Sequence, residues 1–193
     1  MVPADVFRDQ PSLVGQRVRL EPIGAGNAND LIPSTVDMDP EVRRFTGTHQ
    51  EFTAEQLLKV FAAWEQRHDR ADWVIYRTED DAPFGDCALI DLDPDNAEVN
   101  YRIALDSMAS TGKGYGTEAT DLVLEYAFET AGLHRVALQV FDFNTQAQRS
   151  YEKSGFVREG VWREHLRWDG KWHDAVLMSM LDHEYAERRG RRG

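Results

Sequence analysis

The sequence predicts an α+β fold organised around a mixed, mostly antiparallel sheet of seven strands. Strand-like runs between residues 72 and 105 are separated by short acidic turns, which is typical of an antiparallel meander. A glycine-rich turn at residues 111–117 follows the last of these runs and opens a helical pattern. Near the end of the chain, two long strand patterns are joined by Asp169-Gly170, a pair that favours a type I′ hairpin turn.

The first elements precede the meander. Alternating residues at 16–22 predict a strand. A short helix is expected over about 29–36, and another short helical segment starts at Asp39-Pro40-Glu41, where proline suits the first turn. Thr53-Ala54-Glu55-Gln56 has the form of a capping box and leads into apolar residues at helical spacing, which predicts a helix over about 54–67.

The remaining elements follow in order. The expected elements are strands at 72–78, 84–91 and 98–105, a helix from the glycine turn to about 131 that ends at Gly132, a strand at 134–141, a short helix at 144–154 closed by Gly155, and hairpin strands at about 156–168 and 171–181.

Length and composition predict one domain. The chain has 193 residues, of which 41% are hydrophobic and 29% charged, as in ordinary soluble globular proteins. It contains no repeat, no low-complexity tract and no apolar run near the roughly 18 residues that span a bilayer. We therefore expect residues 1–193 to form a single domain, with about 185–193 as a flexible basic tail.

Charge and cysteine content restrict the class of protein. The net charge of −12 argues against nucleic-acid binding; it is compatible with a cationic acceptor, but solubility explains it equally well. The N-terminus lacks a signal-peptide pattern, and the single Cys87 cannot form an internal disulfide, so a cytoplasmic location is expected. Cys87 is interpreted as a buried, inert thiol. The six histidines lack metal-ligand spacing, which predicts no metal.

The glycine turn is the most informative stretch. Gly112, Gly114 and Gly116 let the backbone turn sharply, and the first N–H groups of the following helix lack intrahelical partners. Such a turn can bind a phosphate through main chain alone, although it can equally be a tight connection without a ligand. A dinucleotide fingerprint fails because its third glycine would fall on Thr117, and a Walker loop fails because Gly114 follows Lys113.

A second stretch supplies polar side chains. Asn144 and Tyr151 are seven residues apart, two helical turns, so they project from about the same helix face. Asn144 is also a natural N-cap for that helix.

Together the two stretches resemble the GCN5-related N-acetyltransferase (GNAT) family. The glycine turn is similar to the family's pyrophosphate loop, Gln/Arg-x-x-Gly-x-Gly/Ala, with Gly114 and Gly116 in place and Thr111 where Gln or Arg is usual. The family's second motif is matched, about 30 residues later, by Asn144, Ala147, Tyr151, Gly155 and Phe156. The resemblance covers most of the chain and is strongest to ribosomal-protein alanine and spermidine acetyltransferases. It implies helices on both faces of the sheet and a splay between the fourth and fifth strands.

The resemblance also implies acetyl-CoA as co-substrate and an amine as acceptor. Tyr151 would be the acid that protonates the leaving thiolate, and Glu98 is a candidate base, with His165, Glu164 and Asp174 as other candidates. The residues implied in cofactor binding are Ile103, Ala104 and Leu105 beside the pantetheine arm, Gly112, Lys113, Gly114, Tyr115, Gly116 and Thr117 at the pyrophosphate, and Asn144 and Arg149, with Lys153 an alternative to Arg149.

Several questions stay open at this level. The acceptor is either a protein N-terminal α-amine or a small amine or polyamine, with an antibiotic amine as a third class. An acetyl-CoA-binding sensor that kept the fold without turnover is the alternative to an enzyme. No nucleic-acid or membrane partner is expected; dimers are common in such relatives, but the sequence does not fix the oligomeric state.

Overall fold

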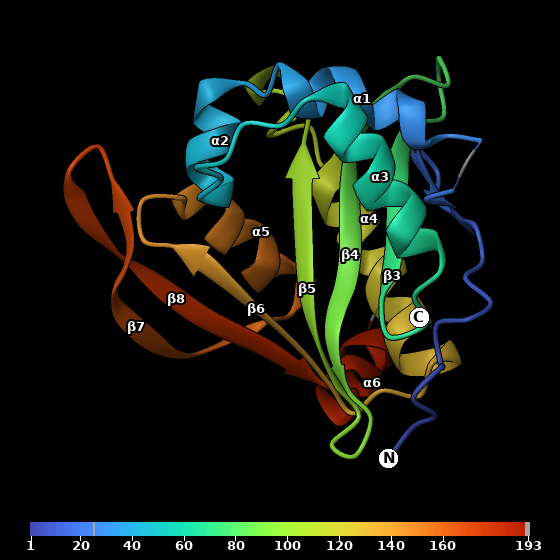
Figure 1. Ribbon diagram of the computed structural model, residues 1–193. Coiled ribbons are helices and arrows are strands. Elements are labelled where there is room, and N and C mark those ends of the chain that lie inside the picture. The colour runs from blue at the N-terminus through green and yellow to red at the C-terminus, as the bar shows by residue number, and fades with distance from the viewer. Residues whose placement is uncertain (25, 192–193) are drawn as a thin grey trace.

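The central sheet has eight strands in the order β1-β2-β3-β4-β5-β6-β8-β7 in the computed structural model, which describes residues 1–24 and 26–191 (Figure 1). The strands are β1 (Leu13–Val14), β2 (Val18–Pro22), β3 (Ala71–Arg77), β4 (Pro83–Asp93), β5 (Glu98–Leu105), β6 (Arg135–Phe141), β7 (Val157–Trp168) and β8 (Lys171–Leu181). Neighbours are antiparallel except β5 and β6, which are parallel. The predicted mixed sheet is confirmed. The additional strand is β1, whose two residues are too few to show alternation in the sequence.

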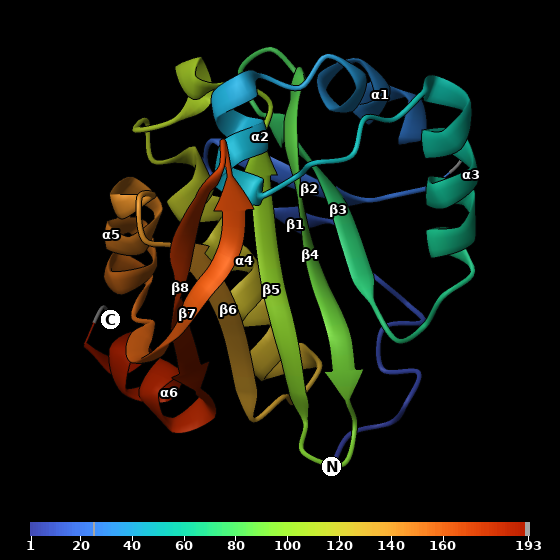
Figure 2. The same ribbon diagram turned by 60° about the vertical axis from the view of Figure 1, so that its left-hand side comes forward.

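Helices cover both faces of this sheet. They are α1 (Ala28–Val36), α2 (Pro40–Thr46), α3 (Ala54–Glu65), α4 (Tyr115–Glu125), which continues into a π-helical turn (Tyr126–Thr130), α5 (Thr145–Ser154) and α6 (Asp182–Gly190). Figures 1 and 2 show α3 on one side of β3 and β4, and α4 on the other. No helix in the part of the chain that the structure describes has the length and apolar character needed to cross a membrane.

The two faces carry separate apolar cores. Trp73, Leu89 and Val123 belong to the larger core, which joins the sheet to α4. Val74 and Phe61 belong to the second, beneath α1 and α3. Because β3 is covered on both sides, all its residues from Ala71 to Tyr76 are buried.

The predicted helix caps are present. The Gln56 amide donates to Thr53 Oγ1 (3.3 Å) and the Thr53 amide donates to Gln56 Oε1 (2.9 Å), which completes the capping box of α3. At the other end of the chain, Asp169 and Gly170 both have positive φ, at 46° and 77°, as a type I′ turn requires.

The strands β5 and β6 separate after one end of their ladder. They pair only from Glu98↔Arg135 to Asn100↔Ala137, whereas β5 stays paired with β4 as far as Leu105. Over its whole length β6 stays paired with β8, so it diverges from β5 together with β8 (Figure 1). The predicted splay between these strands is therefore confirmed, and one edge of β5 beyond Asn100 has no strand partner.

The end of the chain differs from the flexible tail expected from residue 185. Residues up to Gly190 belong to α6, and Tyr185 is buried and donates a hydrogen bond to Glu129 (2.8 Å). Arg188 donates to Asp121 on α4 (2.7 Å). These contacts with distant residues order a segment whose own composition is basic and polar. Residues 192 and 193 of the expected tail lie outside the described residues.

Candidate active site

A groove of about 1340 Å³ occupies the space between the diverging strands. Its walls come from β5, β6 and the edge strand β7, from the glycine turn and α5, and on the opposite face of the sheet from α2. The predicted site residues that line it are Tyr151, Glu98, Ile103, Ala104, Leu105, Gly112, Gly114, Gly116, Thr117, Asn144 and Arg149. The groove thus reaches both faces of the sheet, as a site for two substrates requires.

Two predicted cofactor residues do not line this groove. Tyr115 packs its ring against Phe84, with 5.2 Å between the ring centroids, and Lys113 is an exposed residue of the turn. Only the main chain of these two residues is therefore placed to take part in binding at the turn.

The backbone of the glycine turn explains its composition. Gly112 and Gly114 have φ values of +72° and +85°, in the left-handed region that other residues rarely adopt. Gly116 lies in the first turn of α4, where a Cβ would stand 3.9 Å from Ile103 and 4.0 Å from Leu105. A larger side chain at 116 would therefore narrow the groove between α4 and β5.

The N–H groups of this turn are free to bind a ligand. No acceptor for the amides of residues 112–117 occurs in the described ranges 1–24 and 26–191, and the first amide with a partner is that of Glu118, which donates to Gly114 O (3.1 Å). Gly114 is the N-cap of α4 and has no side chain to cap it. Amides that converge at a helix N-terminus form an anion site, because the helix dipole adds positive potential there.

Two hydroxyl pairs fix α4 beside this turn. Thr117 Oγ1 lies 2.8 Å from Ser150 Oγ on α5, and Thr120 Oγ1 lies 3.0 Å from Tyr101 Oη on β5. All four residues line the groove. Ser150, Thr120 and Tyr101 were missed in the sequence because each pair joins segments that are distant along the chain.

Tyr151 has the environment of a proton donor. Its side chain is buried and packs edge-on against Phe156, with 5.8 Å between ring centroids. Burial raises the pKa of Tyr151 to about 12, so its hydroxyl is protonated at neutral pH. This hydroxyl makes no hydrogen bond with the described residues, and Tyr151 lines the groove. The proton is therefore available to a group bound there.

Glu98 lies at the closed end of the splay. Its Oε1 accepts a hydrogen bond from Arg135 Nε (3.0 Å), and Arg135 also donates to both oxygens of Glu159 on β7 (2.8 and 2.5 Å). One carboxylate oxygen of Glu98 is thus hydrogen-bonded to the Arg135 guanidinium. The other oxygen has no such partner among the described residues and could accept a proton. Further along β5, Asn100 donates to Asp91 (3.2 Å) and Arg102 pairs with Asp86 (2.7 Å).

The other candidate bases separate into two groups. His165 lines the groove and packs beside Trp162, with 4.9 Å between their rings. Asp174 accepts a hydrogen bond from the backbone of Glu164 (2.8 Å), and neither of these two residues lines the groove.

The helix α5 supplies the remaining polar residues. Asn144 caps it by accepting a hydrogen bond from the Ala147 amide (3.1 Å), which confirms the N-cap. Arg149 and Lys153 are exposed and line the groove. No group of three or more metal-ligating side chains is found in the described part of the chain.

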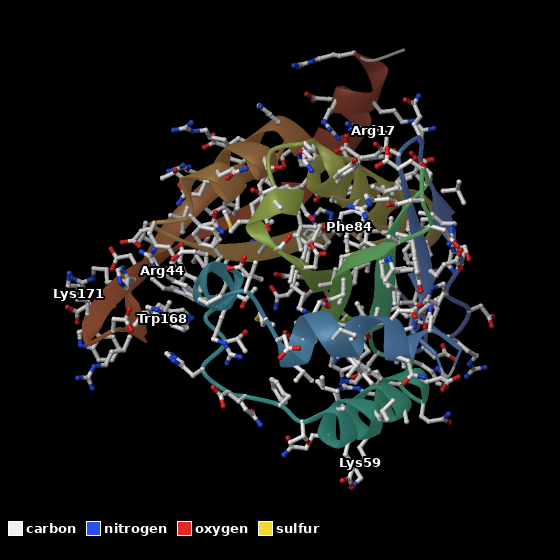
Figure 3. All side chains as sticks on the ribbon, turned by 90° about the horizontal axis from the view of Figure 1, so that it is seen from above. Arg17, Arg44, Lys59, Phe84, Trp168 and Lys171 are labelled. Carbon is white, nitrogen blue, oxygen red and sulfur yellow. The ribbon has the colours of Figure 1, made fainter. Side chains whose placement is uncertain are left out.

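The acceptor side contains residues that the sequence did not reveal. Val42 and Phe45 of α2 line the groove, and Phe45 stacks on Phe143 with 6.1 Å between ring centroids. Arg44 on α2 lies over the ring of Phe143, 4.3 Å from its centroid, and Trp168 on β7 stacks on His49, with 4.9 Å between ring centroids; Figure 3 labels both Arg44 and Trp168. The segment before residue 53 carries no motif, so its contribution depends on tertiary packing alone.

Comparisons with known proteins agree with this geometry. The model of the acetyltransferase (GNAT) domain matches residues 17–157. The probable N-acetyltransferase YjcK of Bacillus subtilis is 28% identical over 134 residues, covering 68% of this chain and 74% of that protein. The spermidine N(1)-acetyltransferase of Vibrio cholerae is 34% identical over 100 residues, covering 52% of this chain and 57% of that protein.

A solved structure shows the same fold. The spermidine N-acetyltransferase from Vibrio cholerae, in complex with CoA and spermine, superposes with a TM-score of 0.80 at 19% identity, and the match covers 89% of this chain and 99% of that one. Because the family model spans well over half of the sequence, the assignment does not depend on that likeness. The chain belongs to the GNAT acetyltransferases, enzymes that take their acetyl group from acetyl-CoA.

Proposed function

We propose that this enzyme acetylates a primary amine by direct attack of the amine on the thioester of acetyl-CoA bound in the groove between β5 and β6. The observation that carries the proposal is the set of unpartnered amides at residues 112–117, next to a strand edge that is also unpaired. The amides of the turn can donate hydrogen bonds to a diphosphate. The unpaired edge of β5 can form hydrogen bonds with the amide groups of a pantetheine arm.

The proposed contacts follow the groove. The amides of Gly112 to Thr117 bind the diphosphate, and the free edge of β5 at Ile103 to Leu105 pairs with the pantetheine arm as an added strand would. Asn144 lies beside the arm, and Arg149 or Lys153 meets the nucleotide phosphates. The thioester then lies near the apex of the splay, close to Tyr151.

The chemistry proposed for the side chains is acid–base catalysis. The acceptor must be a neutral amine, because an ammonium has no lone pair. Its nitrogen attacks the thioester carbon, the carbon–sulfur bond breaks, and Tyr151 gives its proton to the departing thiolate. Glu98, directly or through water, takes the proton that the amine loses. Backbone donors stabilise the oxyanion that develops during attack.

Carboxylates on the groove favour a small cationic amine as acceptor. Asp91, Glu98 and Glu159 line the groove, and the whole chain carries a net charge of −12. Both raise the local concentration of a positively charged acceptor. The similarity to a spermidine acetyltransferase also supports a polyamine. A protein N-terminal α-amine is the other candidate, since one relative that is 37% identical over 103 residues is named a ribosomal N-acetyltransferase.

A thiol-release screen tests the proposal. The enzyme is incubated with acetyl-CoA and a panel of polyamines, other small amines, antibiotic amines and N-terminal peptides, and free CoA is measured. We expect release with at least one primary amine and none with the derivative of that amine in which every amino group is acetylated. Acetyl-CoA binding by calorimetry without CoA release from any amine would instead indicate a sensor, and no binding at millimolar acetyl-CoA would exclude the proposed site.

A further inference from the structure

Arg17, just before β2, reaches the glycine turn from behind the groove. Its Nη1 donates to the carbonyl of Lys113 (2.9 Å) and its Nη2 to the carbonyl of Gly114 (3.4 Å). Figure 3 shows Arg17 at the edge where the start of the chain meets the first turn of α4. Arg17 does not line the groove, and its guanidinium contacts the turn through these two carbonyls and not through the free amides.

The guanidinium is itself held in place. Arg17 Nε donates to Glu118 Oε2 (2.9 Å), while Glu118 Oε1 accepts from the backbone amides of Gln16 (2.6 Å) and Arg17 (2.9 Å). Although burial alone would raise it, these hydrogen bonds lower the pKa of Glu118, so the carboxylate is ionised. All three guanidinium nitrogens therefore have protein partners.

The backbone around this contact is tight. A Cβ on Gly15 would lie 2.4 Å from Glu118 Oε1, and a Cβ on Gly114 would lie 3.0 Å from Arg17 Nη2. A side chain at Gly15 or Gly114 would therefore displace the end of the Glu118 or Arg17 side chain and disturb this contact. Two segments about 100 residues apart are joined at the point where the diphosphate is proposed to bind.

The geometry of the peptide bond gives this contact its consequence. In a trans peptide the C=O and the N–H point in opposite directions. A guanidinium that holds the carbonyls of Lys113 and Gly114 on the back of the turn therefore directs the amides of Gly114 and Tyr115 toward the groove. The positive charge of Arg17 also offsets the negative charge of Glu118. Without Arg17, this carboxylate would repel an anion at the N-terminus of α4.

We propose that Arg17 is a positioning residue for the diphosphate, acting through the carbonyls of Lys113 and Gly114 rather than by touching the ligand. This inference rests on the proposed function of the turn. It requires that the loss of Arg17 lower kcat/KM for an acetyl donor that carries a diphosphate and leave kcat/KM nearly unchanged for an acetyl donor that lacks one.

The experiment compares two acetyl donors with the same amine. Acetyl-CoA carries the diphosphate, and S-acetylpantetheine does not. For Arg17→Ala we expect kcat/KM with acetyl-CoA to fall about tenfold, as for loss of charge-assisted hydrogen bonds. With S-acetylpantetheine, kcat/KM should stay within about twofold of wild type. Calorimetry should show the same roughly tenfold weaker binding of CoA, which is a readout independent of turnover.

Two further variants sharpen the test. Arg17→Lys keeps the charge and one donor, so about a threefold loss with acetyl-CoA is expected; it also carries the test if the alanine variant does not fold. Arg19→Ala is the matched control, because Arg19 is the next arginine along the same strand and pairs with Glu21 and Asp81, away from the turn. It should leave the ratio of the two donors unchanged.

Three outcomes would overturn the inference. One is a folded Arg17→Ala enzyme with unchanged affinity for CoA. Another is an equal loss with both donors, which would indicate a general structural role. The third is a wild-type enzyme with equal kcat/KM for acetyl-CoA and S-acetylpantetheine. That result would show that the turn does not bind the diphosphate, and it would contradict the proposed function of the turn as well.

Discussion

At the scale of single residues, Tyr151 combines burial with access. Its ring is covered by the core, which raises the pKa of the hydroxyl, yet the residue lines the groove and the hydroxyl has no partner among the described residues. The Tyr151 hydroxyl is not among the fully buried side-chain oxygens that lack a partner, so it opens to the groove and is accessible to a bound group. This combination supports the assignment of Tyr151 as the proton donor.

Replacing Tyr151 by phenylalanine removes the proton and keeps the ring. We expect kcat to fall by about ten- to a few hundred-fold, since CoA thiolate is already a fair leaving group, while the Kd for acetyl-CoA stays near wild type. Steady-state kinetics and calorimetry measure the two quantities. Tyr185→Phe is the control, because Tyr185 is as buried as Tyr151 but donates a hydrogen bond to Glu129 outside the groove. An unchanged kcat for Tyr151→Phe would dismiss this residue as the acid.

The raised pKa of Tyr151 also predicts the alkaline side of the pH profile. With a pKa of about 12, the donor remains protonated at pH 8 to 10, where more of the acceptor amine becomes neutral. We therefore expect the kcat of the wild-type enzyme not to decline between pH 8 and 10. A decline with an apparent pKa near 9 that disappears in Tyr151→Phe would contradict the assigned environment.

Gly114 tests the geometry of the turn. At φ +85° an alanine costs about 1–2 kcal/mol of stability, and its Cβ would also meet Arg17. Gly170 offers a matched control, because it has φ +77° in the β7–β8 turn and a Cβ added there would have no atom within 4 Å. Both alanine variants should unfold at lower urea concentration, but only Gly114→Ala should weaken acetyl-CoA binding. Equal affinities in calorimetry would show that the turn does not bind the cofactor.

At the scale of elements, Arg135 joins three strands at the apex of the splay. It lies on β6, pairs with Glu98 on β5, and reaches across β8 to Glu159 on β7. These two ion pairs, which form the Arg135 clamp, lie where β5 and β6 are still paired, and the groove begins just beyond them. They connect the three strands at the end of the ladder where the groove begins.

The Glu159 carboxylate makes the strength of this clamp depend on pH. The hydrogen bond from Arg135 lowers the pKa of Glu159 to about 2, below its ordinary value of 4.5. A lowered pKa contributes stability that is fully present above the unfolded value and is lost as the pH falls from about 4.5 toward 2. Because Glu159 is 40% exposed, Glu159→Gln should cost only about 0.5–1 kcal/mol at pH 7.

Urea unfolding at pH 7, 5, 4 and 3 measures this dependence. The difference in unfolding free energy between wild type and Glu159→Gln should shrink steadily below pH 4.5. Glu55→Gln, which breaks the exposed pair between Glu55 and Lys59 on α3, should cost less at every pH. A difference for Glu159→Gln that stays constant down to pH 3 would contradict the lowered pKa.

At the scale of the whole molecule, the proposed function places the donor and the acceptor on opposite sides of the sheet. In this proposal, the side with α4 and α5 presents the amides and basic residues to the donor, and the side with α2, together with the edge strand β7, presents aromatic and acidic residues to the acceptor. The splay is the opening between them. A fold with a fully paired sheet would keep the two sides apart, so the short β5–β6 ladder is the structural condition for the reaction.

Local patterns predicted most of this arrangement. The capping box at Thr53, the N-cap at Asn144 and the Asp169-Gly170 turn are each determined by neighbouring residues, and the structure confirms them. The meander and the glycine turn were predictable for the same reason. The resemblance of two short motifs then supplied the splay.

Contacts between distant segments could not be predicted. Arg17 meets the glycine turn, and Arg135 meets Glu159, only after the sheet has formed. Residues from about 185 onward were expected to be a flexible basic tail, whereas residues 185–190 belong to α6 and contact partners such as Glu129 on the π-helical turn. Phe45 on α2 entered the acceptor side in the same way, from a segment without a motif.

Hydrogen–deuterium exchange with CoA tests the central claim most directly. If the groove between β5 and β6 binds the cofactor, saturating CoA should slow exchange of the amides at 112–117 and along the free edge of β5 at 101–105. S-Acetylpantetheine should slow exchange along β5 and leave 112–117 unchanged. Protection by CoA that appears elsewhere, with these two segments exchanging as fast as in the free protein, would contradict the account.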